Sequence, residues 1–406
     1  MHYFSHQLPN GLRVVHLPIE SPVSYCGFAI NAGTRDENAD EFGLAHFVEH
    51  MLFKGTEKRK AWHILNRMEN VGGELNAYTT KEETFVYSIF MEEHYARAFE
   101  LLTDLVFHSR FPKQELEKER DVILDEINSY EDSPSELIYD EFENLLYKDH
   151  ALGHNILGDE SSLLKFTSET GLSFIRRFYA PENMVFFSMG RKDFGKIIKL
   201  VEKALGDINF QLAPRNRIAP GDIVPYSKRI KKDTHQSHVL IGGRAYSMYD
   251  DKRISLFLLN NILGGPGMNS LLNLSLREKY GLVYNVESNV TSYTDTGLAN
   301  IYFGTDPKNM DKAIALVEKV LKRLREEKLT MNQLAAAKKQ VIGQLGISGD
   351  NKEGLFLGFG KSFLHHNRYD TLPEVFSKIE KIQAEELQSV ANEIFTPENM
   401  FSLIYQ

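Results

Sequence analysis

The 406-residue sequence has one cysteine, one tryptophan and no long apolar run. Because Cys26 is alone, an intrachain disulfide is excluded, and such cysteine usage is typical of a reducing compartment. No apolar run approaches the ~20 residues that span a bilayer. The first residues carry no charged region followed by an apolar core, so they do not predict a signal peptide. We therefore expect a cytoplasmic protein without a membrane anchor.

Basic segments are also scarce. The net charge is −9 and the pI is about 5.9, which argues against nucleic acid as a partner. The densest basic run, residues 228–232, is interpreted as a solvated strand or turn edge. With 42% hydrophobic and 25% charged residues, the composition is ordinary for a soluble globular protein. The length predicts two or three domains.

The chain divides at a proline-rich stretch. Residues 207–226 contain Pro214, Pro220 and Pro225 with little hydrophobic periodicity, and we place a linker at 213–226. The first half (1–212) closes on Pro181-Glu-Asn-Met and the second (227–406) on Pro397-Glu-Asn-Met, and 397 − 181 = 216. Each repeated segment precedes a strand-like stretch, which favours an internal duplication. Hairpins mixed with helices predict an α+β fold of two homologous domains, each a mainly antiparallel sheet backed by helices.

Only the first half contains His-x-x-Glu-His, at His46, Glu49 and His50. Apolar spacing over residues 41–55 predicts an amphipathic helix that Asp40 caps and Gly55 ends. At ~100° per residue the two histidines lie about 40° apart, so one turn can present both to one metal ion. This order is the inverzincin signature, with the glutamate beside a metal-bound water. The alternative is a pair of structural histidines.

A catalytic zinc site needs a third protein ligand. The helix predicted at 112–128 offers Glu126, which lies between Ile123 and Ile127 near the buried side. An unpaired carboxylate is costly there unless a metal or hydrogen bonds compensate. Glu119, seven residues earlier, falls on the same face. The alternative for both is a solvated charged face.

These motifs resemble the M16 metallopeptidases, the pitrilysin and mitochondrial-processing-peptidase family, and in particular their short bacterial members. In that family a glutamate follows the second histidine by about 76 residues, and here 126 − 50 = 76. A second family glutamate falls on Glu119. The segments at 43–56 and 72–79 also match, and the likeness covers nearly the whole chain. The resemblance implies His46, His50 and Glu126 as zinc ligands, and two similar domains with the metal in the first.

The resemblance also implies a substrate site. The predicted strand 75–79 matches the family strand that binds an extended peptide, with Asn76, Ala77 and Tyr78 at its centre. Taken alone it is an ordinary paired strand. In the second half, Arg277 and Tyr284 match an arginine and a tyrosine seven residues apart, which hold the substrate backbone and stabilise the tetrahedral oxyanion.

The second half departs from the usual family sequence at one loop. Pro266 is an extra residue in the glycine-rich turn at 264–270, and Leu271 stands where an arginine usually follows the serine. The shape of this loop is therefore not predicted. No Gly-Lys-Ser/Thr follows, so the turn is not a phosphate-binding loop.

Together these features predict a zinc endopeptidase that acts on peptides or unfolded segments. We expect one Zn²⁺ per chain, Glu49 as general base and Glu119 as a residue that orients a ligand or tunes the site. Longer single-chain relatives resemble two joined copies of this chain, with zinc in the first copy and the arginine and tyrosine in the second. A homodimer, or a heterodimer with a paralogue, would pair the same elements. The alternatives are a non-catalytic subunit of the same fold and a zinc hydrolase with a non-peptide substrate.

Overall fold

The computed structural model describes residues 2–215, 217–222 and 226–406, so parts of the predicted linker, at 216 and 223–225, lie outside the described residues. The chain forms two compact units. The first contains Met1–Ser129, His154–Arg217 and Gly349–Tyr369. The second contains Tyr130–Gly153, Ile218–Ser348 and Asp370–Gln406. The predicted ranges 1–212 and 227–406 describe two duplicated halves of the sequence, and they stay a prediction.

A six-stranded sheet forms the centre of the first unit, in the order β1-β2-β6-β3-β5-β4. The β2–β6 pair is parallel and the other pairs are antiparallel. The strands are β1 (Phe4–Gln7), β2 (Arg13–Pro18), β3 (Val23–Ile30), β4 (Glu74–Thr79), β5 (Thr84–Met91) and β6 (Met184–Gly190). The helices are η1 (Thr34–Asp36), α1 (Leu44–Leu52), α2 (Ala61–Glu69), η2 (Glu92–His94), α3 (Tyr95–His108), α4 (Lys113–Glu131), α6 (Glu160–Leu163), α7 (Ser168–Phe178), η3 (Pro181–Asn183), α8 (Phe194–Leu205) and α12 (Lys352–His366).

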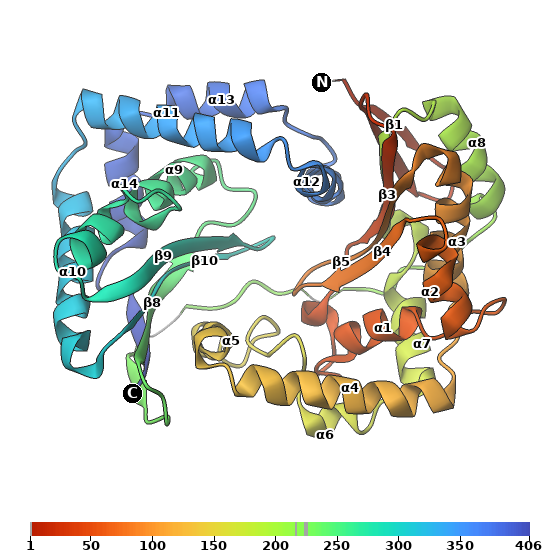
Figure 1. Ribbon diagram of the computed structural model, residues 1–406, viewed down its shortest axis with the longest axis horizontal. Coiled ribbons are helices and arrows are strands. Elements are labelled where there is room, and N and C mark those ends of the chain that lie inside the picture. The colour runs from red at the N-terminus through yellow and green to blue at the C-terminus, as the bar shows by residue number, and fades with distance from the viewer. Residues whose placement is uncertain (1, 216, 223–225) are drawn as a thin grey trace. The chain divides into compact units, whose positions relative to one another are not determined.

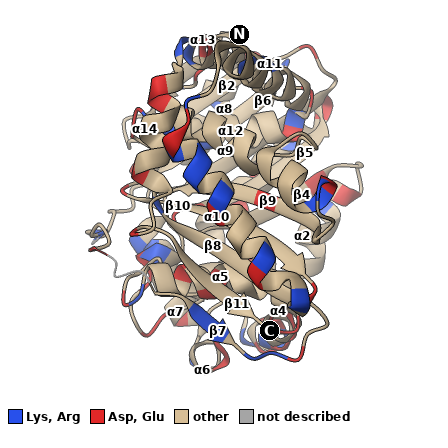
Figure 2. Cartoon of the chain, turned by 90° about the vertical axis from the view of Figure 1, so that its left-hand side faces the viewer, with Lys and Arg blue, Asp and Glu red and all other residues tan. Residues whose placement is uncertain are grey.

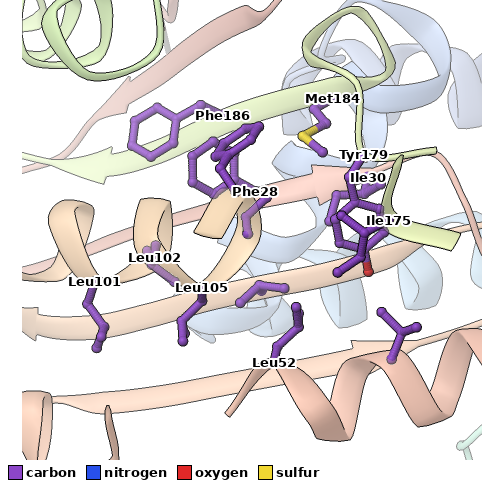
Figure 3. Packing of buried hydrophobic residues seen from close by; sticks show 14 of the residues in the cluster. Phe28, Ile30, Leu52, Leu101, Leu102, Leu105, Ile175, Tyr179, Met184 and Phe186 are labelled. Carbon is purple, nitrogen blue, oxygen red and sulfur yellow. The ribbon is translucent and has the colours of Figure 1, made fainter. Parts of the chain in front are cut away.

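Helices cover both faces of this sheet (Figure 1). On one face, Leu52 of α1 and Leu105 of α3 reach the same buried cluster as Phe28 and Phe186 of the strands (Figure 3). On the other face lies α12, whose Phe356 stacks on Phe187 at 4.3 Å between ring centroids. This burial of apolar faces on both sides explains why the central strands read as nearly continuous hydrophobic runs.

The second unit has a five-stranded sheet in the order β7-β11-β8-β10-β9, again with one parallel pair, β7–β11. Its strands are β7 (Lys228–Ile230), β8 (Ser237–Ala245), β9 (Val283–Ser292), β10 (Gly297–Thr305) and β11 (Phe401–Tyr405). Its helices are α5 (Pro134–Leu146), α9 (Arg253–Gly264), the π-helix η4 (Asn273–Glu278), α10 (Met310–Glu326), α11 (Met331–Ser348), α13 (Leu372–Lys381) and α14 (Ala384–Ile394).

Each sheet is also covered by a helix from the other half of the sequence. Phe142 of α5 stacks on Phe401 of β11 in the second unit, with ring centroids 4.4 Å apart, while α12 covers the first sheet. The predicted α+β fold of two sheets backed by helices is confirmed. On α10, Figure 2 shows lysine and arginine interspersed with acidic residues. Among the described residues, no helix is both long and apolar enough to cross a membrane.

Candidate metal centre

The helix that carries the motif, α1, begins three residues later than the sequence predicts. Gly43, with φ of 91°, precedes it, and Asp40 does not cap it. The carboxylate of Glu37 instead accepts the N–H groups of Gly43 at 3.0 Å and Ala45 at 2.7 Å. Only a left-handed glycine fits here, because a Cβ at Gly43 would lie 2.6 Å from the carbonyl oxygen of Leu157. The predicted cap was wrong because the helix begins later, and Glu37, six and eight residues before Gly43 and Ala45, reaches their amides instead.

Three side chains from α1 and α4 converge at one place. One ligand atom each from His46, His50 and Glu126 lies within 4.8 Å of the other two. The Glu126 Oε2 atom is 3.8 Å from His46 Nε2 and 3.7 Å from His50 Nε2. These separations exceed a hydrogen bond and suit three atoms placed around one ion. The two imidazoles and the carboxylate are the donor set that Zn²⁺ accepts in catalytic sites.

The protonation of the histidines fits this role. Burial, followed by the proximity of His50, lowers the pKa of His46 to about 3, so its imidazole is neutral at neutral pH. His50 directs Nδ1 at Glu119 Oε1, 2.9 Å away, which leaves Nε2 pointing towards Glu126. A carboxylate behind a histidine in this way fixes the ring and its tautomer for metal binding.

Glu119 is held by two partners. Besides the bond from His50, Lys54 Nζ lies 2.6 Å from Glu119 Oε2. Burial alone would raise the pKa of Glu119, but the hydrogen bonds from His50 and Lys54 outweigh it and lower this pKa. The glutamate is therefore ionised, with 5% of its surface exposed. The contact to Lys54 was not predicted, although its position four residues after His50 could have suggested it.

Glu49 lies on α1 between His46 and His50, and this helix packs against β4 of the sheet. Burial raises the pKa of its carboxyl group, while hydrogen bonds from the side chain and backbone of Thr79 act in the opposite direction. Thr79 is the last residue of β4. The sequence placed Thr79 at the end of the predicted substrate strand 75–79 but did not connect it to Glu49.

The predicted substrate strand is the edge of the first sheet. In the described part of the chain, β4 pairs with β5 alone, with Asn76 opposite Tyr87 and Ala77 opposite Val86. Tyr78 stacks on Phe85, with ring centroids 4.9 Å apart. All three predicted residues are half-buried. The strand therefore has one edge on which an extended peptide could add.

The remaining predicted residues belong to the second unit. Arg277 lies in the π-helix η4, and such helices occur frequently at functional sites. Its guanidinium carbon is 5.7 Å from the ring centroid of Tyr284, at the start of β9. Tyr284 is 86% exposed. Arg277 and Tyr284 are thus brought together, in the unit that does not contain the histidine–glutamate cluster.

Known proteins resemble this chain along its whole length. Residues 14–160 match the sequence model of the insulinase family, peptidase family M16, and residues 165–341 match the M16 inactive domain. An uncharacterized zinc protease of Bacillus subtilis, YmxG, is 32% identical over 397 residues, which cover 97% of this chain and 96% of YmxG. An uncharacterized zinc protease of Rickettsia felis is 31% identical over 392 residues, covering 96% of this chain and 94% of its own.

Solved structures share the fold. A protease from Helicobacter pylori superposes with a TM-score of 0.92 at 21% identity, over 100% of this chain and 99% of its own. An M16-like peptidase from Alicyclobacillus acidocaldarius gives a TM-score of 0.88 at 24% identity, over 100% and 98%. The family models, the relatives and the convergence of His46, His50 and Glu126 lead to one conclusion: the chain belongs to peptidase family M16.

Proposed function

We propose that the protein is a cytoplasmic zinc-dependent endopeptidase that hydrolyses peptides or unfolded segments, with Glu49 as general base. The observation that carries this proposal is the cluster of His46, His50 and Glu126 within 4.8 Å, with Glu49 on the same helix as both histidines. One Zn²⁺ per chain, held by these three residues, would supply a water of lowered pKa and polarise the peptide carbonyl. The relatives called zinc proteases support this assignment.

Glu49 has the properties of a proton carrier. A buried carboxyl group with a raised pKa takes a proton from water more readily than an exposed one and can return it to the leaving amine. Thr79, at the end of β4, is the residue whose hydrogen bonding opposes the effect of burial on the pKa of Glu49. Glu119 fixes the ring of His50 and does not itself contact the substrate.

The substrate binds along β4 in this proposal. Main-chain hydrogen bonds at the free edge, around Asn76, Ala77 and Tyr78, accept many sequences and require an extended chain. This requirement selects short peptides and unfolded segments over folded proteins. Arg277 and Tyr284 are proposed to hold the substrate backbone and donate to the developing oxyanion.

We place these two residues in the site of another subunit. A homodimer with twofold symmetry gives two equivalent chambers, each with a metal centre from one chain and Arg277 and Tyr284 from its partner. A paralogue could take the partner's place. Mixing inactive Glu49→Gln protein with inactive Arg277→Ala protein tests this, since one site of each mixed dimer regains both residues. Activity should return after subunit exchange; its absence despite verified exchange would place the pair in cis.

The decisive experiment on catalysis compares zinc content and peptide turnover. Glu49→Gln should retain about one zinc per chain and lose about 10²- to 10⁴-fold in kcat, the usual contribution of a general base. Glu117→Gln, on the exposed face of α4, is the matched control and should resemble wild type. Full turnover by metal-free protein would overturn the proposal, and zinc binding without any peptide turnover would favour a non-catalytic binding subunit.

A further inference from the structure

The turn between β4 and β5 carries three consecutive buried charges. Lys81, Glu82 and Glu83 are 3%, 3% and 2% exposed. Thr80 closes the turn: its N–H donates to the Glu83 carbonyl at 2.8 Å, and its hydroxyl accepts the N–H groups of Glu82 and Glu83 at 3.3 and 3.2 Å. Hairpin turns usually place such residues in water, so the burial of all three calls for specific partners.

Glu82 is tied to η1 and to the segment that leads out of the first unit. Its Oε1 atom accepts a hydrogen bond from Arg35 at 2.6 Å, and both side chains are buried. Arg217 donates to the Glu82 carbonyl at 3.0 Å and makes a two-pronged pair with Asp36 at 2.9 and 2.7 Å. Two arginines and one aspartate therefore fix this residue of the turn.

The flanking charges bind two other segments. Glu83 pairs with Lys361 and His365 of α12, and although burial raises its pKa, these partners lower the pKa of Glu83 overall. Lys81 donates through Nζ to the carbonyl of His154. The Nε2 atom of His154 lies 3.0 Å from Glu37, the carboxylate that caps α1. The turn thus contacts α12 and, through His154, the start of the motif helix.

The backbone of the turn is equally constrained. The N–H groups of Thr34 and Arg35 donate to the carbonyls of Thr80 at 3.2 Å and Lys81 at 2.7 Å. This approach needs a glycine, because a Cβ at Gly33 would lie 2.3 Å from the Thr80 carbonyl oxygen. Backbone and side chains together hold the turn from several directions.

The contacted segments lie where the chain enters and leaves the first unit. His154 is the first residue after the stretch Tyr130–Gly153, and Arg217 is the last before Ile218–Ser348. The helix α12 belongs to the returning stretch Gly349–Tyr369. Residues from three segments next to these boundaries are thus fixed on one hairpin turn.

The residue before this turn is Thr79, the last residue of β4, and the helix α1 that carries Glu49 packs against this strand. Hydrogen bonding from the side chain and backbone of Thr79 opposes the effect of burial on the pKa of Glu49. Because β4 is an edge strand, one neighbouring strand holds it instead of two. The position of its last residue therefore depends on the turn. Buried ion pairs add little net stability compared with apolar packing. They can instead specify one conformation, here that of the turn and of the strand end that precedes it.

We propose that the turn Thr80–Glu83 is a positioning element for the active site: its buried charges hold Thr79 against Glu49 and set the end of the substrate strand. This inference rests on the proposed function, in which Glu49 is the base. Lys81, Glu82 and Glu83 act through Thr79 and do not touch the substrate.

Glu82→Gln tests the proposal, with Glu93→Gln as a matched control because Glu93 follows the same hairpin and its side chain is 79% exposed. We expect unchanged zinc content, faster hydrogen exchange at the Thr79 amide and a fall in kcat of about tenfold with little change in KM. Thr79→Val should lower kcat similarly. The double variant Glu82→Gln/Thr79→Val should be no slower than Thr79→Val alone, since both changes break one chain of contacts.

Additive losses in the double variant, or Thr79 exchange equal to wild type, would overturn the proposal. Should Glu82→Gln fail to fold, Arg217→Gln removes the contacts to Asp36 and to the Glu82 carbonyl from a partly exposed side chain and predicts the same exchange at Thr79. Hydrogen exchange needs no turnover. A wild-type protein without peptidase activity would refute the proposed function, while the exchange data would still decide whether the turn holds Thr79.

Discussion

The α1–α4 junction of the first unit and the α9–α11 junction of the second share a layout and differ in chemistry. Leu116 and Ile123 of α4 correspond to Leu334 and Val341 of α11, with 334 − 116 = 341 − 123 = 218, and all four are buried. In the same register Glu126 corresponds to Gln344. Adding 211 to a residue number in α1 gives the corresponding residue in α9, so His50 corresponds to Asn261 and Leu52 to Leu263.

The contacts support this register. Asn261 Nδ2 donates to Gln344 Oε1 at 2.8 Å, where the first unit has His50 Nε2 3.7 Å from Glu126. Asn260, which corresponds to Glu49, bonds Ser288 of β9, whereas Glu49 bonds Thr79 of β4. The strands β4 and β9 are the equivalent edges of their sheets.

The comparison teaches that the scaffold does not by itself make the metal centre. Two carboxamides satisfy each other directly and need no ion. Two imidazoles and a carboxylate lie beyond hydrogen-bond distance, arranged around a common point. Within 2–215, 217–222 and 226–406, His46, His50 and Glu126 are the only group of this kind. The difference lies in the side chains at three helical positions.

The largest expected effect comes from deleting one partner in each junction. His50→Ala should abolish zinc binding and peptide turnover, because two ligands are too few for a catalytic site. Asn261→Ala should keep one zinc and its turnover and lose about 1 kcal/mol of unfolding free energy from the broken amide bond. Metal analysis and calorimetry of both variants check this. Loss of zinc in Asn261→Ala would refute the separation of roles.

A gain of metal would sharpen the comparison further. The triple variant Phe257→His, Asn261→His and Gln344→Glu places the ligand types of the first unit on the matching positions of α9 and α11. Phe257 is 43% exposed, so a histidine fits there without opening a cavity. Zinc content should rise from about one to about two per chain. Asn261→His alone is the control and should keep one; a triple variant that folds and still binds one would refute the register.

Glu119 should have an intermediate effect. It corresponds to Ala337 in the second unit, since 337 − 119 = 218. Glu119→Gln should weaken zinc affinity or activity by about 10- to 100-fold, as for other residues that orient a metal ligand. Competition with a zinc chelator measures the affinity. Ala337→Ser is the matched control and should change nothing; equal affinities for Glu119→Gln and wild type would show that His50 is oriented without it.

A last effect concerns acid stability and leaves zinc binding and turnover at pH 7 unchanged. Burial lowers the pKa of His16 in β2 to about 4, below the value of about 6.5 in the unfolded chain. The contribution of neutral His16 to the free energy of unfolding is therefore complete above pH 6.5. It is lost as the pH falls towards 4, by at most about 3 kcal/mol. In β7 the corresponding residue is Arg229, since His16 pairs with Ser188 and Arg229 with Ile404, and 404 − 188 = 397 − 181 = 216. Arg229 is exposed and pairs with Asp311 at 3.1 Å. Calorimetry at pH 7 and pH 5 should show a smaller acid loss for His16→Gln than for wild type, and an unchanged one for Arg229→Gln.

The sequence by itself indicated most of the elements around the candidate metal centre and the residues that converge there. Helical spacing predicted that His46 and His50 lie one turn apart, and the family resemblance, through its 76-residue interval, pointed to Glu126. The prediction that Glu126 lies near the buried side was wrong, because its side chain is 43% exposed. The repeated Pro-Glu-Asn segment indicated two related halves.

Only the tertiary structure decided which contacts between elements complete the candidate site and which helices cover each sheet. Glu37 rather than Asp40 caps α1, Lys54 reaches Glu119 and Thr79 reaches Glu49. The helix α5 comes from the first half of the sequence and covers the second sheet, and α12 comes from the second half and covers the first sheet. Apart from Lys54, whose position one helical turn after His50 is a local signal, these contacts join residues whose separation along the chain carries no periodic signal, so burial and packing select them.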